Sequence, residues 1–377
     1  MVDAGFRLVT VTEGSSAPSL ALVNGSSRFS GITLSAMPYA TALSHRGLRV
    51  RWYQCVDAAK EPYVPADGVV VPGLGLPIES LEMGINRLWV FPRRLRTVPE
   101  DVLLLTDPTL SFAAHGHPRT AVLVHDLLPL TEFADRRDSR WMFRAILPRL
   151  RRMRLIVVTT PTMGDELVRR GVDPGIVRVV PYTHELGVHP DHPARSVERI
   201  ARTGVVRLLY IATDRPFKNV DFVLRLAERL NAATSGPRFE VTLLSSLRPE
   251  TRRRVADMKL PNLRVVDRVA SVGELYEGSD VLLYPSRHEG FGRPLIEAMA
   301  YGLPIFANRI QPFIDILGPT GTLLSVDSTE AWAAALNALV DGATYSDLAR
   351  RSLERASALS PDRFERSVAE AFRELLE

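Results

Sequence analysis

Residues 285–304 read PSRHEGFGRPLIEAMAYGLP, and this stretch predicts a glycine-rich turn followed by a helix. The apolar residues 281–284 that precede it are typical of a buried strand. Pro294 opens the predicted helix, which ends near Gly-Leu-Pro at 302–304. A strand, a short turn and a helix in this order are typical of an α/β protein with a parallel sheet.

The same stretch offers partners for a ligand that carries phosphate. Gly290 and Gly292 can adopt backbone angles closed to other residues, and they leave room for a ligand. The amides at the helix N-terminus carry partial positive charge, which suits a phosphate. Glu289 in the turn and Glu297, expected in the first helical turn, are good acceptors for vicinal hydroxyls. A ligand with both phosphate and diols is a sugar nucleotide.

The string Glu-Gly-Phe-Gly-x-Pro-x-x-Glu-Ala-Met-Ala-x-Gly-x-Pro, which begins at Glu289, resembles the Glu-x7-Glu motif of retaining glycosyltransferases with the GT-B fold, most closely family 4. The alternative is an ordinary strand–turn–helix with unrelated glutamates. The resemblance implies two Rossmann-like domains whose parallel sheets face each other across a cleft. It also implies that Glu297 binds the ribose diol and Glu289 the sugar hydroxyls of a nucleotide-diphosphate sugar. The residues implied to contact the rest of the donor are Gly290, Phe291, Gly292, Arg293, Pro294 and Leu295.

Length and composition are those of a globular protein with two domains. The chain has 377 residues, of which 46% are hydrophobic and 24% charged. It contains no run of about 20 uncharged apolar residues, and we expect neither a membrane-spanning helix nor a secretion signal. The single cysteine, Cys55, excludes an internal disulfide and fits the cytoplasm. A net charge of +4 does not indicate a nucleic-acid partner.

Strands alternate with helices in both halves, which predicts parallel sheets covered on both faces. We expect a Rossmann-like acceptor domain at 1–186, a linker at 187–204 and a nucleotide-sugar-binding domain at 205–362. The resemblance implies that the C-terminal helix, 363–377, packs back on the first domain. The predicted strands are 6–11, 20–23, 48–53, 102–105, 121–124 and 155–158 in the first half, and 206–211, 241–244, 263–266, 281–284 and 305–307 in the second.

A second motif, residues 209–219, reads LYIATDRPFKN. A strand ends here, and Arg215 and Lys218 follow in the loop where open α/β sheets bind ligands. The departure of a nucleoside diphosphate develops negative charge that a metal or fixed cations must neutralise. The chain has no Asp-x-Asp sequence, so we expect fixed cations and no metal. The segment resembles the family's phosphate-binding loop, although Phe217 stands where many members have a basic residue; the alternative is a pair of solvated surface cations.

A third motif, residues 122–130, reads VLVHDLLPL and resembles the family's catalytic-cleft histidine motif. The resemblance implies that His125 reaches the transferred sugar, and the alternative is a loop histidine whose hydrogen bonds stay within its own domain. Asp126 either orients the imidazole or caps the next turn. Two weaker assignments follow from the resemblance: Gly31 approaches the diphosphate, and Arg268 with Val269 borders the nucleobase, where an exposed arginine is the alternative.

Together these motifs predict transfer of a hexose or deoxyhexose, with retention of configuration, to a glycan, a lipid-linked acceptor or a small molecule. The alternatives are a non-catalytic sugar-nucleotide-binding subunit and a GT-B nucleotide-sugar epimerase. Residues 89–96 and 140–154 interleave apolar side chains with arginines. Such stretches lie on anionic membranes or form a core-facing stripe with a solvated arginine face. The expected location is the cytoplasm, with peripheral contact at the inner face of the membrane if the first alternative holds.

Overall fold

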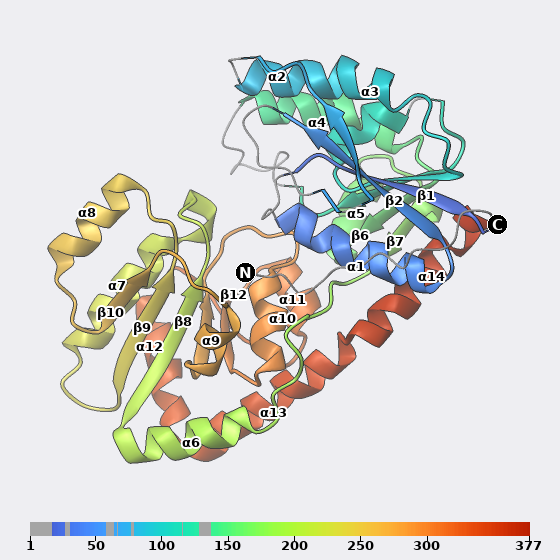
Figure 1. Ribbon diagram of the computed structural model, residues 1–377. Helices are drawn as coiled ribbons and strands as arrows, with labels where there is room; N and C mark the ends of the chain where they lie inside the picture. Colours follow the sequence, from blue (N-terminus) through green and yellow to red (C-terminus); the bar gives the residue numbers. More distant parts are fainter. Residues whose placement is uncertain are drawn as a thin grey trace. The chain divides into compact units, whose positions relative to one another are not determined.

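The computed structural model describes residues 17–26, 31–57, 64–65, 67–76, 79–114, 116–127 and 137–377. These residues form two compact units, one of the described residues up to Tyr182 together with Asp362–Glu377, the other of Thr183–Pro361. Each unit is a parallel sheet flanked by helices (Figure 1). This confirms the predicted α/β class with two parallel sheets. The predicted strand at 6–11 lies outside the described residues.

The N-terminal unit contains, in its described part, a seven-stranded sheet in the order β3-β2-β1-β4-β5-β6-β7. The strands are β1 (Ser19–Asn24), β2 (Arg49–Val56), β3 (Val69–Pro72), β4 (Val102–Leu105), β5 (Thr120–Val124), β6 (Leu155–Val158) and β7 (Val177–Val179). The helices are α1 (Gly31–His45), α2 (Glu79–Ile85), the π-helix η1 (Asn86–Val90), α3 (Phe91–Arg94), the 3-10 helix η2 (Pro108–Ala114), α4 (Arg137–Leu150), α5 (Pro161–Arg169), the 3-10 turn η4 (Pro174–Ile176) and α14 (Pro361–Leu376).

The last helix, α14, packs on the N-terminal unit through one apolar face. Phe364, Val368 and Phe372 are buried at helical spacing, and the Phe364 ring meets Tyr39 edge-on with centroids 4.9 Å apart. At the rim of this contact, a Glu365 carboxylate oxygen lies 3.0 Å from His45 Nδ1.

The C-terminal unit has a six-stranded sheet in the order β10-β9-β8-β11-β12-β13. Its strands are β8 (Val205–Ile211), β9 (Arg238–Leu244), β10 (Leu263–Val266), β11 (Val281–Tyr284), β12 (Ile305–Asn308) and β13 (Thr322–Leu324). Its helices are α6 (His192–Thr203), the 3-10 turn η5 (Pro216–Lys218), α7 (Val220–Ala232), α8 (Pro249–Met258), α9 (Gly273–Glu277), α10 (Arg293–Ala300), α11 (Gln311–Leu317), α12 (Thr329–Asn337), the 3-10 turn η6 (Ala338–Val340) and α13 (Gly342–Ala358).

Helix α6 lies within the segment that the sequence assigned to a linker. Its buried positions are His192, Ser196 and Ile200, one per turn. Two of these three residues are polar, so the sequence shows no apolar stripe. His192 satisfies its buried ring by bonding Nε2 to the Glu277 carbonyl oxygen at 3.0 Å.

Both sheets reverse their strand order at one point. In the C-terminal unit the order runs from β8 through β9 to β10 on one side and from β11 through β12 to β13 on the other. In the N-terminal unit the reversal falls between β1 and β4. In open α/β sheets ligands bind at such switch points, outside the carboxyl ends of the strands. The loops after β8 and β11 therefore define the candidate site of the C-terminal unit.

Candidate functional site

The switch point of the C-terminal unit brings together two residues that the sequence singled out separately. Lys218 follows β8 and Glu289 follows β11, and the Lys218 ammonium forms an ion pair with the Glu289 carboxylate. The two side chains are only 16% and 10% exposed. Tyr284, the last residue of β11, donates its hydroxyl to the same carboxylate oxygen at 2.8 Å. A cation and a carboxylate are thus paired at a largely buried point between the loops after β8 and β11.

Backbone and side-chain bonds hold the two loops in register. The Arg287 amide donates to the Phe217 carbonyl oxygen at 2.7 Å. Asn219, in the left-handed conformation with φ 62°, donates its side-chain amide to the Pro285 carbonyl at 3.2 Å. The Phe217 ring is buried and contacts His288 edge-on. Phe217 therefore anchors the loop in the core, which accounts for an apolar residue at this position.

Tyr284 and Tyr276 support the two glutamates, and sequence analysis missed both. Tyr276 donates its hydroxyl to Glu297 at 2.8 Å, as Tyr284 does to Glu289. Burial, and then the charge of the neighbouring glutamate, raise the pKa of each tyrosine well above its usual value. Both hydroxyls therefore stay protonated and donate. The sequence did contain a signal for Tyr284, which ends an otherwise apolar, buried strand. A buried phenol needs a hydrogen-bond partner, so a polar residue close to it could have been expected.

Glu297 lies one residue further into α10 than the sequence predicted. The helix begins at Arg293, so Glu297 starts its second turn. From the predicted start at Pro294, Glu297 would be the fourth helical residue and fall in the first turn. Arg293 lies beside Glu297, with Nε 3.7 Å from a carboxylate oxygen. Glu297 therefore faces outward next to a cation, and 18% of its side chain is exposed.

The turn before α10 requires glycine at Gly292, where φ is 92°. A Cβ atom there would also lie 3.1 Å from the ring of Tyr284. Without a side chain, Gly292 lets the backbone pass close to the Tyr284–Glu289 pair. Gly292 is also the N-cap of α10, so no side chain caps the helix N-terminus. Of the neighbouring predicted contacts, Phe291 and Leu295 are buried, whereas Arg293 and Pro294 are partly exposed.

The remaining predicted donor contacts lie before η5 and after β10. Arg215 is exposed and precedes η5. Arg268 and Val269 follow β10, which β9 separates from β8. Arg268 is exposed and Val269 is partly buried.

At the N-terminal sheet, His125 is held by residues of its own unit. Its Nε2 donates to the Thr106 carbonyl oxygen at 2.6 Å, because a carbonyl can only accept. Its Nδ1 is then the acceptor for the Tyr182 hydroxyl. The alternative to sugar contact in the sequence analysis was a loop histidine whose hydrogen bonds stay within its own domain. The observed hydrogen bonds match that alternative. Asp126 is exposed beside it.

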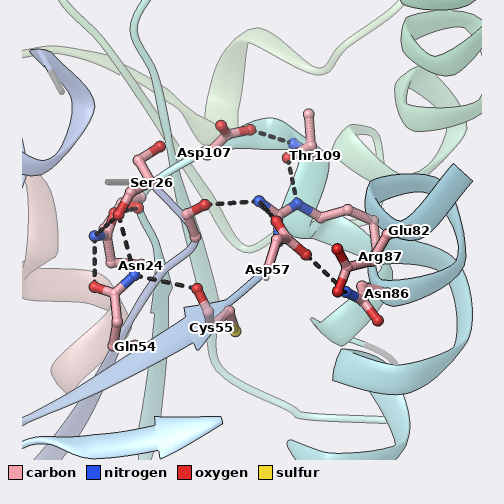
Figure 2. A network of polar contacts seen from close by, with 12 residues as sticks. Asn24, Ser26, Gln54, Cys55, Asp57, Glu82, Asn86, Arg87, Asp107 and Thr109 are labelled. Atoms are coloured by element: carbon pink, nitrogen blue, oxygen red, sulfur yellow. Dashed lines mark hydrogen bonds and ion pairs between the residues drawn. The ribbon is translucent and has the colours of Figure 1, made fainter. Parts of the chain in front are cut away.

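A buried network organises the switch point of the N-terminal sheet (Figure 2). Arg87 donates from Nη2 to the Gly25 carbonyl at 2.8 Å and from Nε to the Thr109 hydroxyl at 3.2 Å. Asp57 lies 3.7 Å from the guanidinium and accepts from Asn86 at 2.7 Å. Arg87 therefore ties the loop after β1 to the loop after β4.

Close packing in this network explains a glycine in the loop after β1. A Cβ atom at Gly25 would lie 2.6 Å from the Arg87 guanidinium. Gly31, the predicted diphosphate contact, is instead the first residue of α1, and a Cβ there would meet no atom within 4 Å. Residues 27–30 between them lie outside the described residues.

Two further properties concern only the described part of the chain. Its His, Cys, Asp and Glu side chains form no group of three that could hold a metal ion. None of its helices is both long and apolar enough to cross a membrane.

Comparison with solved structures identifies the fold as GT-B. The chain superposes on sucrose-phosphate synthase from Thermosynechococcus elongatus with a TM-score of 0.76 over 95% of this chain and 99% of that one, at 19% identity. It superposes on HepE of Anabaena, solved in complex with UDP-glucose, with a TM-score of 0.73 over 94% and 99% of the two chains, at 15% identity. The predicted GT-B architecture is confirmed.

Family profiles then match both units. The profile described as Glycosyltransferase Family 4 matches residues 29–183, and that described as Glycosyl transferases group 1 matches residues 206–342. The chain belongs to glycosyltransferase family 4.

Curated relatives share about a quarter of their residues with this chain over the matched region, and they are longer than that region. The MMP alpha-(1->4)-mannosyltransferase of Mycolicibacterium hassiacum is 27% identical over 50% of this chain and 45% of its own length. The D-inositol 3-phosphate glycosyltransferase of Acidothermus cellulolyticus is 26% identical over 59% and 53% of the two chains. The chain thus spans about half the length of these curated relatives.

Proposed function

We propose that this chain is a retaining glycosyltransferase that moves a hexose or deoxyhexose from a nucleotide-diphosphate sugar to a glycan, lipid-linked or small-molecule acceptor. The observation that carries the proposal is the Lys218–Glu289 ion pair at the switch point, supported by Tyr284 and adjoining the N-terminus of α10. Membership of family 4 supports both the reaction class and the retention of configuration.

Each member of this cluster has a role that follows from its charge. The diphosphate of the donor competes with Glu289 for the Lys218 ammonium, and the amides at the start of α10 supply further positive potential. Glu289, still bonded to Tyr284, then accepts hydrogen bonds from the sugar hydroxyls. As the glycosidic bond breaks, charge grows on the diphosphate, and Lys218 stabilises it more strongly than in the bound donor.

The other assignments remain part of the proposal. Glu297 accepts from the ribose diol, with Tyr276 fixing the carboxylate. Arg215 adds charge near the diphosphate, and Arg268 with Val269 borders the base. Gly31 allows the diphosphate to approach α1.

His125 contributes to sugar binding only by exchanging a partner. A sugar hydroxyl would replace the Tyr182 hydroxyl at Nδ1, while the bond from Nε2 to Thr106 keeps the ring in place. We therefore expect His125→Ala to lower transfer but to leave the affinity for the sugar-free nucleoside diphosphate nearly unchanged. Titration calorimetry with the diphosphate, beside a transfer assay, separates the two effects.

The proposed donor is a nucleotide hexose. The relatives include a mannosyltransferase, and the HepE structure of the same fold holds UDP-glucose. We propose a cytoplasmic location with peripheral contact at the inner face of the membrane, where lipid-linked acceptors are accessible. Fixed cations take the place of a metal in this proposal, so transfer is expected to persist in excess EDTA.

The deciding experiment screens UDP-, GDP-, ADP- and dTDP-sugars for thermal stabilisation, because a ligand that binds the folded state raises the melting temperature. The stabilising donor is then incubated with candidate acceptors, and the anomeric configuration of the product is determined by NMR. An inverted product, or a free 2-epimer of the sugar, would contradict the proposal. Donor binding without consumption with any acceptor would instead favour the non-catalytic subunit.

A further inference from the structure

An arginine-lined cavity of about 850 Å³ lies in the N-terminal unit, apart from the residues assigned to the donor. Its walls come from η1 and α3, from η2 and the turn after it, and from the end of α4 with the residues that follow. Two stretches far apart in sequence, 88–96 and 148–153, thus line one cavity. Both belong to the segments in which the sequence interleaves arginines with apolar residues.

The described lining of the cavity concentrates positive charge. Its described lining includes four arginines and no aspartate or glutamate, and none of the four forms an ion pair with a described residue: Arg93, Arg96, Arg149 and Arg152. Burial, and then the charge of Arg152, lower the pKa of Arg149 from its usual value. Such mutual repulsion is relieved by an anion in the cavity.

Several other surface arginines of this chain are paired with carboxylates. Arg169 and Arg170 both contact Glu166, and Arg350 bonds Asp347 at 2.7 Å. Single unpaired arginines, such as Arg202 and Arg253, also occur on the described surface, so the feature that marks the cavity is that four arginines line one hollow.

A buried hydroxyl independently indicates a missing polar partner. Ser111 lines the cavity and is only 3% exposed, and its Oγ has no hydrogen-bond partner among the residues that the structure describes. A buried hydroxyl without a partner is costly. A phosphate oxygen in the cavity would accept from it.

Much of the rest of the lining is apolar. The Arg149 guanidinium stacks on the Phe112 ring at 3.7 Å, and the Arg93 guanidinium lies 5.7 Å from the ring centroid of Trp89. Trp89 itself is 60% exposed. By contrast Ile146 and Leu150 of α4 are buried in the core, so the described part of the apolar stripe of α4 faces inward. Trp89 and the arginines would therefore be the residues that contact a lipid surface.

We propose that this cavity binds the phosphate group of an anionic phospholipid and so seats the N-terminal unit on the membrane surface. Arginines beside an exposed tryptophan match a headgroup above its acyl chains, whereas a soluble anion would need no exposed aromatic ring. The inference rests on the proposed peripheral membrane contact and is independent of glycosyl transfer. Donor-induced thermal stabilisation therefore reports separately on the proposed function.

The test is co-sedimentation of the full chain with phosphatidylcholine vesicles, with and without phosphatidylglycerol. We expect binding only to the anionic vesicles. The Arg93→Ser/Arg96→Ser variant should bind roughly 25-fold more weakly, at about fivefold per arginine near an anionic surface. The matched control, Arg202→Ser/Arg253→Ser, removes the same charge at exposed positions of the other unit and should bind like wild type.

Ser111→Ala distinguishes a ligand contact from a general charge effect. It should weaken vesicle binding about tenfold, the value of a hydrogen bond to a charged group, without lowering the melting temperature. Equal losses in the two double variants would overturn the proposal. A second outcome would also overturn it: the protein does not bind anionic vesicles, but inorganic phosphate raises its melting temperature in a way that depends on Arg93 and Arg96. The ligand would then be a soluble anion.

Discussion

The Lys218–Glu289 pair gives the sharpest test of the site, through Lys218→Met. The substitution leaves a carboxylate that is 10% exposed and still accepts a hydrogen bond from Tyr284. Breaking a buried ion pair costs about 3–5 kcal/mol. Because Tyr284 remains and the pair is not fully buried, we expect a loss of about 2–3 kcal/mol in unfolding free energy. Glu289→Gln keeps an accepting oxygen and should cost about 1–2 kcal/mol.

A double-mutant cycle measures the interaction itself. Urea unfolding of wild type, both single variants and Lys218→Met/Glu289→Gln should give a coupling of about 2 kcal/mol, since the double variant leaves no uncompensated charge. The matched control is the Arg254–Asp221 pair of the same unit, whose side chains are 45% and 61% exposed. Its cycle, with Arg254→Met and Asp221→Asn, should give less than about 1 kcal/mol.

The same variant tests the role in transfer. If Lys218 stabilises the leaving diphosphate, Lys218→Met lowers kcat by about 10²–10³ and changes the donor KM far less. Near-normal turnover together with a coupling no larger than that of the exposed control pair would refute the reasoning. Lys218 would then be a surface cation, which is the alternative that the sequence left open.

Three further predictions follow from the structure. Glu297→Ala should weaken binding of the nucleoside diphosphate by about 1.5–3 kcal/mol in titration calorimetry, with a smaller loss for Tyr276→Phe; unchanged affinity in both would exclude the ribose assignment. Cys55 is buried, and burial raises its pKa to about 12, so a thiol reagent should label it only after unfolding, and rapid labelling of the native protein would contradict this burial. Burial lowers the pKa of His184, so the unfolded chain takes up the proton first as pH falls below about 6.5; stability should fall there by up to about 1.4 kcal/mol per pH unit, and less steeply in His184→Leu, as measured by urea midpoints.

The central strands could be predicted because they are buried on both faces. Strands β4, β5, β6 and β11 read as short apolar runs, and their bounds agree with the prediction to within one residue. The short edge strands β3, β7 and β13 were missed. All three are only three or four residues long: β7 and β13 mix polar with apolar residues, and β3 is a run of three valines that ends at a proline. Pairing with a neighbouring strand defines them.

Within the site, the motif residues could be identified but their partners could not. Glu289 and Lys218 stand in recognisable local patterns, while the ion pair between them joins positions 71 residues apart. Tyr284 looked like the end of an apolar strand. That its hydroxyl bonds Glu289 depends on the course of the following turn, which Gly292 allows through its left-handed backbone.

The sequence by itself determined the alternation of strands and helices, the glycine turn before α10 and the family resemblance, because each depends on residues close together in the chain. Only the tertiary structure decided that β8 lies beside β11, which places Lys218 against Glu289. It also gathered the arginines of 88–96 and 148–153 around one cavity. Local periodicity specifies which face of an element is apolar, whereas the order of strands and the packing of helices arise from burying all those faces at once.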